Sequence, residues 1–350
     1  MMHEVKENAL IAQLAALLPH RPTQVNGLQE SDAELIRLPG EGNRILAVTT
    51  DGIVEEIDAG LYKDPYLIGW MTVMANLSDL AAVGADPVGL LVAETLPRGI
   101  SDSDVIALQT GIRDACLHTG TPVLGGDTNF SDRLHTTGTA IGLISDGPPL
   151  MRVQCKPGEA LFCTGFLGTG NAYAALHTMG TAVHDGILYR PTARLQEGAS
   201  LRSCASTCMD TSDGLLATLD QLGRLNACGF ELTGALEDII APDALRVASQ
   251  TGLAPWMLLA APHGEFELVF TVPECRIDAL HRAAERAGWA PIRIGMATEE
   301  PGLVSSDWER LTPDDLAAIR NYTLDTAADR LAFPRFLANL AEKRGKSTKR

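Results

Sequence analysis

Short and long hydrophobic runs alternate along the first 150 residues, and this pattern predicts a mixed α/β unit. Residues 44–50 (RILAVTT) form a short β-prone run that ends at Asp51-Gly52, so we expect a strand with a carboxylate at its tip. A longer apolar run, 66–83, follows Asp64-Pro65, a pair that caps and starts helices, and it predicts a buried helix. The same patterns predict two further strands, at 88–93 and 136–144, and a second helix at 102–118.

The second half of the chain repeats this alternation. Strands are expected at 160–164 and 266–272, and helices at 168–177, 215–225 and 278–287. The turn-forming segment Gly147-Pro148-Pro149 separates the two halves. We therefore expect an N-terminal domain over 1–149, a C-terminal α/β domain over 150–335 and a disordered basic tail over 336–350.

Charge and composition limit the classes of function. The formal net charge of -16 argues against nucleic-acid or anionic-membrane binding through a basic surface, because the long-range field repels phosphate. No apolar run approaches the roughly 20 residues of a membrane-spanning helix. The apolar stretch 9–18 is interrupted by Gln13 and preceded by acidic residues, so we interpret it as an amphipathic helix and not as a signal peptide. Seven cysteines without a CxxC pair indicate reduced thiols and a cytoplasmic protein.

Aspartates recur at predicted strand ends, in glycine turns and in the buried helix: Asp32, Asp51, Asp79, Asp127, Asp210 and Asp213. Taken singly, most have ordinary structural explanations as turn formers, helix caps or loop residues, as for Asp127 in the glycine turn 125–127. Asp79 differs because it shares a face with Asn76 inside a helix too apolar to be exposed, and a buried carboxylate needs a partner, usually a cation. Carboxylates that converge within roughly 5 Å repel each other by about 3 kcal/mol per pair, and bound Mg²⁺ offsets this repulsion.

Five segments occur in the order and spacing of thiamine-monophosphate kinases: TTDGIVEE (49–56), NLSDLAAVGADP (76–87), GGDT (125–128), LMRVQCKPGEALFCTG (150–165) and MDTSDGLL (209–216). Over about residues 30–275 the chain thus resembles the thiamine-monophosphate kinase-like branch of the aminoimidazole ribonucleotide synthetase (PurM-like) superfamily. The resemblance implies a two-domain α/β (α+β) fold. It further implies an N-terminal domain that pairs with its twin in the barrel of a homodimer, and a site for ATP and Mg²⁺ in the cleft between the domains.

The resemblance also implies roles for individual residues. The implied metal ligands are Asp32, Thr49, Thr50, Asp51, Asp79, Asp127, Asp210 and Asp213. The implied nucleotide contacts are Gly126, Asp127, Arg152 and Ser212. Of these residues, Asp51, Asp127 and Asp213 are expected to lie closest to the catalytic chemistry.

Three departures from the family pattern concern the ligands and the acceptor. Glu30-Ser31-Asp32 stands where the family has Gly-Asp-Asp, so one acidic ligand is lost. Asp58 stands where the family has a histidine that contacts thiamine phosphate. The block 262–268 (PHGEFEL) replaces GGEDYEL, and Gly264 aligns with the substrate-facing glutamate, although a second alignment places Glu265 there. We take Asp58, His263 and Glu265 as candidate substrate contacts and expect the acceptor to differ from thiamine phosphate.

The expected function is Mg-ATP-dependent phosphoryl transfer to a small molecule, a reaction that needs positioning and charge neutralisation more than a base. Two alternatives stay open at this point. One is ATP-dependent activation of an amide or carbonyl oxygen, as in a cyclo-ligase or dehydratase of the aminoimidazole ribonucleotide synthetase type. The other is a catalytically silent nucleotide-binding dimer.

Overall fold

The computed structural model describes residues 4–19, 22–40, 43–179, 187–306, 308, 310–325 and 332–343. Within these residues the chain forms two β-sheets, and it passes from the first to the second between residues 144 and 160. The first sheet has the order β1-β2-β5-β3-β4, with β1 Glu34–Arg37, β2 Ile45–Ile53, β3 Asp86–Pro97, β4 Val123–Ser131 and β5 His135–Ile144. The second has the order β11-β8-β10-β6-β9-β7, with β6 Ala160–Cys163, β7 Thr207–Asp210, β8 Gly229–Leu232, β9 Leu268–Val272, β10 Ile292–Thr298 and β11 Gly302–Val304.

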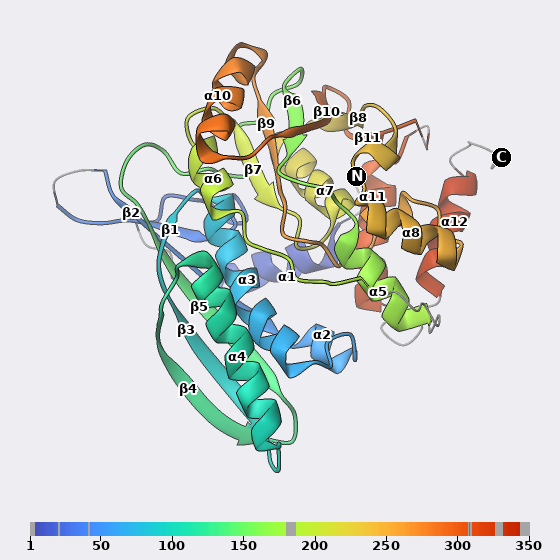
Figure 1. Ribbon diagram of the computed structural model, residues 1–350. Helices are drawn as coiled ribbons and strands as arrows, with labels where there is room; N and C mark the ends of the chain where they lie inside the picture. Colours follow the sequence, from blue (N-terminus) through green and yellow to red (C-terminus); the bar gives the residue numbers. More distant parts are fainter. Residues whose placement is uncertain are drawn as a thin grey trace.

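Two long helices cover one face of the first sheet (Figure 1). Helix α3 (Pro65–Ala82) packs against β2, β3 and β5, and α4 (Asp102–Thr119) packs against α3. The two helices approach closely because Gly111 has no side chain: a Cβ there would lie 2.0 Å from the carbonyl oxygen of Tyr66. The predicted elements of this half are confirmed, with small shifts at their ends.

Helix α3 is buried on nearly all sides, as its apolar sequence predicts. Asp64 caps it by accepting a hydrogen bond from the Tyr66 amide at 3.0 Å, and Pro65 occupies its first turn. Its C-terminal half packs against α6 (Leu195–Leu201) and β7, which belong to the second half of the chain. The helix therefore carries Asp79 to the junction of the two halves.

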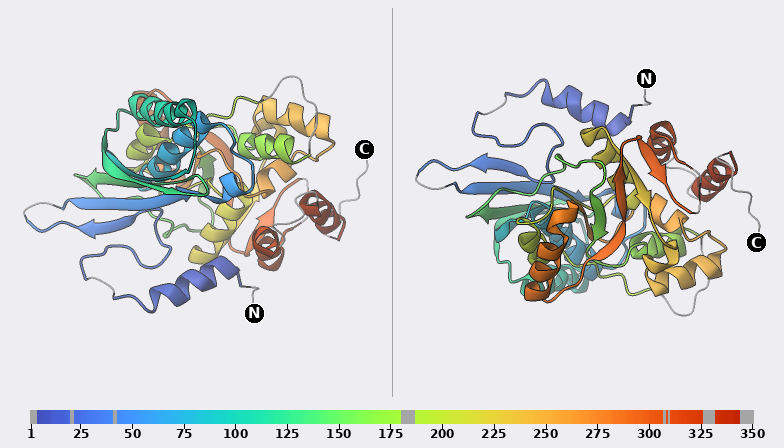
Figure 2. Two further views of the ribbon diagram at one scale, coloured as in Figure 1. Left: turned by 90° about the horizontal axis from the view of Figure 1, so that it is seen from below. Right: turned by 90° about the horizontal axis from the view of Figure 1, so that it is seen from above.

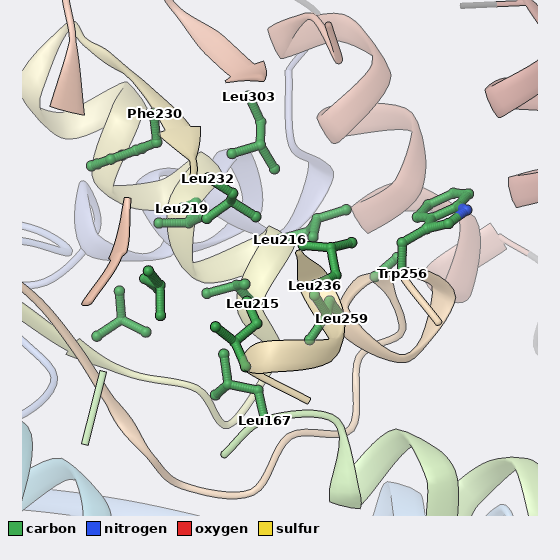
Figure 3. Close-up of a cluster of buried hydrophobic side chains, with 14 of the residues drawn as sticks. Leu167, Leu215, Leu216, Leu219, Phe230, Leu232, Leu236, Trp256, Leu259 and Leu303 are labelled. Carbon is green, nitrogen blue, oxygen red and sulfur yellow. The ribbon is translucent and has the colours of Figure 1, made fainter. Parts of the chain in front are cut away.

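The second sheet and the helices on it pack around a separate hydrophobic core. Helix α7 (Leu215–Asn226) presents Leu215, Leu216 and Leu219 to this core, which also contains Phe230 of β8 (Figure 3). Burial of such side chains contributes roughly 1.5–3 kcal/mol each. Further helices are α2 Glu55–Asp58, α5 Thr169–Met179, α8 Pro242–Thr251, α9 Met257–Ala260, α10 Ile277–Ala287, α11 Pro313–Asp325 and α12 Ala332–Lys343.

The N-terminal helix α1 (Lys6–Ala15) lies beside α7 and α11, which follow it by about 200 residues or more in the sequence (Figure 2). The Lys6 amide donates to Asn321 Oδ1 at 2.9 Å, and Asn8 Nδ2 donates to Gln221 Oε1 at 2.9 Å. The helix predicted at 9–18 thus exists but is shifted toward the N-terminus. None of the helices in the described ranges combines the length and hydropathy that crossing a membrane requires.

Three local predictions were wrong. Asp51 is not at a strand tip, because β2 continues to Ile53 through its pairing with β5. The glycines at 125 and 126 do not form a turn, because β4 runs through them and pairs in parallel with β3. The tail is helical in α12 up to Lys343, whose apolar side chains pack on the second core, while residues 344–350 lie outside the described part of the chain.

Candidate functional site

Three carboxylates converge where the two halves of the chain meet. Asp32 precedes β1, Asp79 belongs to α3 and Asp210 ends β7, and one oxygen of each lies within 4.8 Å of the other two. The side chain of Asp32 is only 1% exposed, and Asp210 is fully buried. The sequence predicts all three as metal ligands, and the structure brings them together.

Hydroxyl groups hold two of these carboxylates in place. Thr49 Oγ1 donates to Asp79 Oδ2 at 2.5 Å. Ser78 Oγ donates to Asp210 Oδ2 at 2.5 Å, and Ser212 Oγ donates to Asp210 Oδ1 at 2.8 Å. Sequence reasoning missed Ser78, although a serine beside Asp79 in an otherwise apolar helix was an available signal.

One arginine neutralises part of this cluster. Arg152 Nη2 donates to Asp32 Oδ1 at 2.9 Å, and the two side chains are 18% and 1% exposed. The other oxygen of Asp32 and the Nε of Arg152 are buried and have no hydrogen-bond partner among the described residues. The ion pair is therefore incomplete on both sides.

The electrostatics of the cluster favour a bound cation. Burial, followed by the charge of neighbouring carboxylates, raises the pKa of Asp79 well above its ordinary value and the pKa of Asp210 to about 7. Two ionised carboxylates within 4.8 Å repel each other by about 3 kcal/mol at an effective dielectric constant of about 20. Three carboxylates, nearby hydroxyls and an unpartnered Asp32 oxygen form an oxygen-only donor set of the kind that fits Mg²⁺.

The cluster borders a cavity of about 840 Å³. The cavity is lined by strand β2, helices α2 and α3, and the loops around residues 152, 189, 212 and 263. Of the predicted site residues it contains Asp32, Thr49, Thr50, Asp51, Asp79, Arg152, Ser212, Asp213 and His263. Glu7 of α1 also reaches it, which links the N-terminal helix to the site.

Asn76 positions Asp51 and is not itself a ligand of the cluster. Its Oδ1 accepts from the Asp51 amide at 2.9 Å, and its Nδ2 donates to the carbonyl oxygens of Asp51 at 3.2 Å and Thr72 at 2.9 Å. The close contact with β5 requires Gly138, because a Cβ there would lie 2.2 Å from Asn76 Nδ2. Asn76 and Asp79 share one face of α3 as predicted, but Asn76 holds the backbone of Asp51 whereas Asp79 belongs to the carboxylate cluster.

Thr50, Gly126 and Asp127 lie outside the cluster, Thr50 through strand alternation although it also lines the cavity, and Gly126 and Asp127 because β4 is the far edge strand of the sheet. Thr50 follows Thr49, so its side chain points to the opposite face of the sheet, where it donates to the Gly138 carbonyl at 2.8 Å. Asp127 pairs with Ala93 on β3 and accepts a hydrogen bond from Asn129 at 2.6 Å. Gly126 and Asp127 line a second cavity of about 880 Å³ beside α4. Their roles as metal or nucleotide contacts stay predictions.

Two of the three predicted acceptor contacts do not line the cavity. Asp58 lies at the end of α2 and forms an ion pair with Arg133 at 3.0 Å, so the charge that replaces the family histidine is already balanced. Glu265 is buried, where it accepts from the Gly168 amide at 2.7 Å and from Thr211 Oγ1 at 3.2 Å. Burial is the main cause that raises the pKa of Glu265 to about 8. We interpret Glu265 as a structural residue that joins the loops at Gly168 and Thr211 through these hydrogen bonds.

Part of the cavity lining is an aromatic wall. Tyr62 and His263 join through a 3.1 Å hydrogen bond between the phenol oxygen and Nε2, and Tyr189 donates to the Gly264 carbonyl at 2.6 Å. Tyr173 stacks behind Tyr189 with ring centroids 4.9 Å apart. Glu56, six positions before Tyr62, also lines the cavity and carries a charge. Sequence reasoning found His263 but missed Tyr62 and Tyr189, which no motif marks, and Glu56, which ends the segment 49–56.

Burial makes His263 an acid-sensitive group. It lowers the pKa of His263 to about 4, with a further contribution from His177, against about 6.5 in the unfolded chain. Between these values the folded state binds fewer protons, so stability falls by up to about 3 kcal/mol as the pH drops from 6.5 to 4. We expect urea unfolding in EDTA at pH 7 and pH 4.5 to show a smaller acid-induced loss for His263→Gln than for the native chain. Equal losses would contradict the assignment.

Comparison with known proteins supports the same picture. Residues 30–144 match the family model described as AIR synthase related protein, N-terminal domain. The chain is 32% identical over 237 residues to the thiamine-monophosphate kinase of Halobacterium salinarum, covering 68% of this chain and 80% of that protein. The crystal structure of tt0281 from Thermus thermophilus is 28% identical, with a TM-score of 0.74 over 87% of this chain and 97% of that one. AaThiL in complex with AMPPCP and TMP, at 22% identity, shares the fold with a TM-score of 0.72 over 88% of this chain and 97% of that one.

The fold and the carboxylate cluster thus define a member of the aminoimidazole ribonucleotide synthetase-related superfamily. Within it, the chain belongs to the thiamine-monophosphate kinase family.

Proposed function

We propose that the protein is an Mg-ATP-dependent phosphotransferase with an altered acceptor site. The observation that carries this proposal is the cluster of Asp32, Asp79 and Asp210 beside a cavity large enough for a nucleotide and a small acceptor. Support comes from the family relatives, which are thiamine-monophosphate kinases, and from a relative of the same fold that binds AMPPCP and TMP.

The residues at the cluster divide the work of phosphoryl transfer. Asp32, Asp79 and Asp210 would hold Mg²⁺, with Asp51 and Asp213 facing the same cavity as further oxygen ligands. Bound Mg²⁺ neutralises phosphate oxygens and orients them for in-line transfer. The chain's own contribution is positioning: Thr49, Ser78 and Ser212 fix the carboxylates, and Arg152 supplies a positive charge for phosphate.

The acceptor would lie against the aromatic wall formed by Tyr62, Tyr189 and His263. These rings offer an uncharged aromatic surface, with Tyr62 and Tyr189 stacked and His263 tilted against both, and the two phenol hydroxyls are fixed by the hydrogen bonds to His263 and Gly264. His263 and Gly264 belong to the block that departs from the family pattern, so we place the change in acceptor here. Asp58 and Glu265 do not take part in this proposal, because neither lines the cavity.

An assay of ATP turnover tests the function. Purified protein is incubated with ATP and either Mg²⁺ or EDTA, alone and with thiamine, thiamine monophosphate and a panel of other small alcohols and phosphate esters. Mg²⁺-dependent ADP with a phosphorylated product supports the proposal. Inorganic phosphate without a phosphorylated product favours the cyclo-ligase or dehydratase reaction. Tight Mg-ATP binding by calorimetry without any turnover would indicate the silent nucleotide-binding dimer.

We also propose a homodimer formed through the first sheet. Strand β4 is an edge strand, and apolar side chains along β3 and β4 are exposed: Val88 48%, Leu91 39%, Val123 47%, Leu124 52% and Phe130 60%. Light scattering should give about twice the chain mass of 37.3 kDa. Leu91→Lys should shift the population to monomer, whereas Leu10→Lys on α1 should not. A native chain that is monomeric at micromolar concentration would refute the dimer.

The protein is proposed to work in the cytoplasm. All seven cysteines are free, and six of them are buried, which fits a reducing compartment.

A further inference from the structure

Arg152 is in an unusual position for a nucleotide-binding residue. It lines the cavity, yet its guanidinium is bound to Asp32, one of the three clustered carboxylates. Its charge also acts on Asp79 and Asp210. Arg152 is therefore the cation that balances the cluster in the metal-free chain.

The ion pair is not built like a permanent structural one. A buried arginine–carboxylate pair is stable when its remaining donors and acceptors are satisfied, usually in a bidentate arrangement. Here a single bond joins Nη2 to Asp32 Oδ1, while Asp32 Oδ2 and Arg152 Nε are buried without a partner in the described part of the chain. Both side chains thus retain a polar atom for a different partner.

The unpartnered oxygen of Asp32 and the unpartnered nitrogen of Arg152 would bind ligands of opposite charge. One oxygen of Asp32 lies within 4.8 Å of an oxygen of Asp79 and of Asp210, so a divalent cation there would contact all three residues. Such a cation carries twice the charge of a guanidinium and takes over the neutralisation of the cluster. The guanidinium, once displaced, has the open cavity beside it, where its planar set of donors matches the oxygens of a phosphate.

We propose that Arg152 is an exchangeable counter-ion that occupies Asp32 in the metal-free protein and transfers to nucleotide phosphate when a divalent cation enters the cluster. This proposal rests on the proposed function and adds a coupling to it. Metal alone must compete with Arg152 and binds weakly. Metal with nucleotide binds more strongly, because the displaced arginine gains a new partner. The two ligands are therefore positively coupled through this side chain.

Titration calorimetry with Mg²⁺, alone and with saturating AMPPCP, tests the exchange. For the native chain we expect at least a tenfold gain in Mg²⁺ affinity when AMPPCP is present. Arg152→Gln should bind Mg²⁺ alone at least tenfold more tightly than the native chain, because the competitor is gone. Its gain on adding AMPPCP should fall at least tenfold, because the phosphate loses its arginine. A purely structural arginine would instead weaken Mg²⁺ binding in both titrations when removed.

A second variant keeps the test decisive if Arg152→Gln folds poorly. Arg152→Lys retains the charge and one contact to Asp32 but lacks the guanidinium donors. It should leave the affinity for Mg²⁺ alone near that of the native chain and reduce the AMPPCP-dependent gain. Unchanged or weaker Mg²⁺ binding by Arg152→Gln, or an unchanged gain in both variants, would overturn the exchange. Failure of the native chain to bind Mg-AMPPCP at all would instead refute the proposed function.

Discussion

Asp79→Asn is expected to reduce Mg²⁺-dependent ADP formation by at least about 100-fold while making the metal-free protein more stable. The loss of activity follows because a proposed metal ligand loses its charge, a change worth several kcal/mol in a site that is proposed to work through a metal. The gain in stability follows because Asp79 lies half-buried beside Asp32 and Asp210, so its neutral replacement removes repulsion. The amide oxygen of asparagine can still accept the hydrogen bond from Thr49. We expect a gain on the order of 2 kcal/mol in EDTA.

Two measurements separate these effects. ADP release is followed at saturating ATP, and urea unfolding is followed in EDTA and in Mg²⁺. Asp278→Asn is the matched control, since this exposed aspartate lies in the first turn of α10 and lines no described part of the cavity. Native activity in the Asp79→Asn variant would show that the carboxylate cluster does not take part in the reaction. Lower stability in EDTA would show that Asp79 is held by favourable contacts instead of being strained by its neighbours.

Asn76→Ala is expected to destabilise the protein by about 3 kcal/mol and to reduce activity with it. Asn76 is fully buried, and its amide makes three hydrogen bonds, two of them to the backbone of Asp51. Truncation leaves the Asp51 amide and carbonyl without these partners, and each unsatisfied buried group costs roughly 1–3 kcal/mol. Asp51 then loses its fixed position at the cavity. Activity should fall even under conditions where the variant is fully folded.

Denaturant unfolding and ADP formation check this prediction together. Asn129→Ala provides the matched control, because it removes the same side chain from an exposed position where the amide donates to Asp127. A loss of stability with unchanged activity per folded molecule would mean that Asn76 supports the fold but does not position Asp51. Equal stability of the two variants would contradict the predicted role of the Asn76 hydrogen bonds in the fold.

The positions of several helices and strands followed from local sequence, whereas others, such as α8, α11, β8 and β10, were not predicted. Apolar runs, caps and turn residues located α3, α4 and α10 within a few residues, because these features act within a helical turn or a strand. The segment 125–127 was misjudged, because glycines that look like a turn are tolerated within an edge strand that pairs with β3. The tail was misjudged because its charges dominate its composition, whereas Leu337 and its apolar neighbours decide its structure by packing.

The chemistry of the site was predictable only in part. Motifs identified Asp32, Asp79 and Asp210 one at a time, but the cluster exists because α3 spans the junction between two sheets. Asp58 and Glu265 were placed at the acceptor by alignment, and the structure puts them outside the cavity lining. A motif records which residues occur in order. It does not record the direction in which each side chain points.

By itself, the sequence determined the type of protein: an acidic α/β chain with carboxylates in family order, one of them in a buried helix where it needs a cation. Its hydrophobic pattern and cap residues also determined several of the elements, because both depend on neighbours a few positions away. Only the tertiary structure decided which carboxylates meet, that Arg152 pairs with Asp32, and that Tyr62, Tyr189 and His263 form one wall. These contacts join residues tens to hundreds of positions apart, and the packing of α3 between the two sheets brings them within bonding distance.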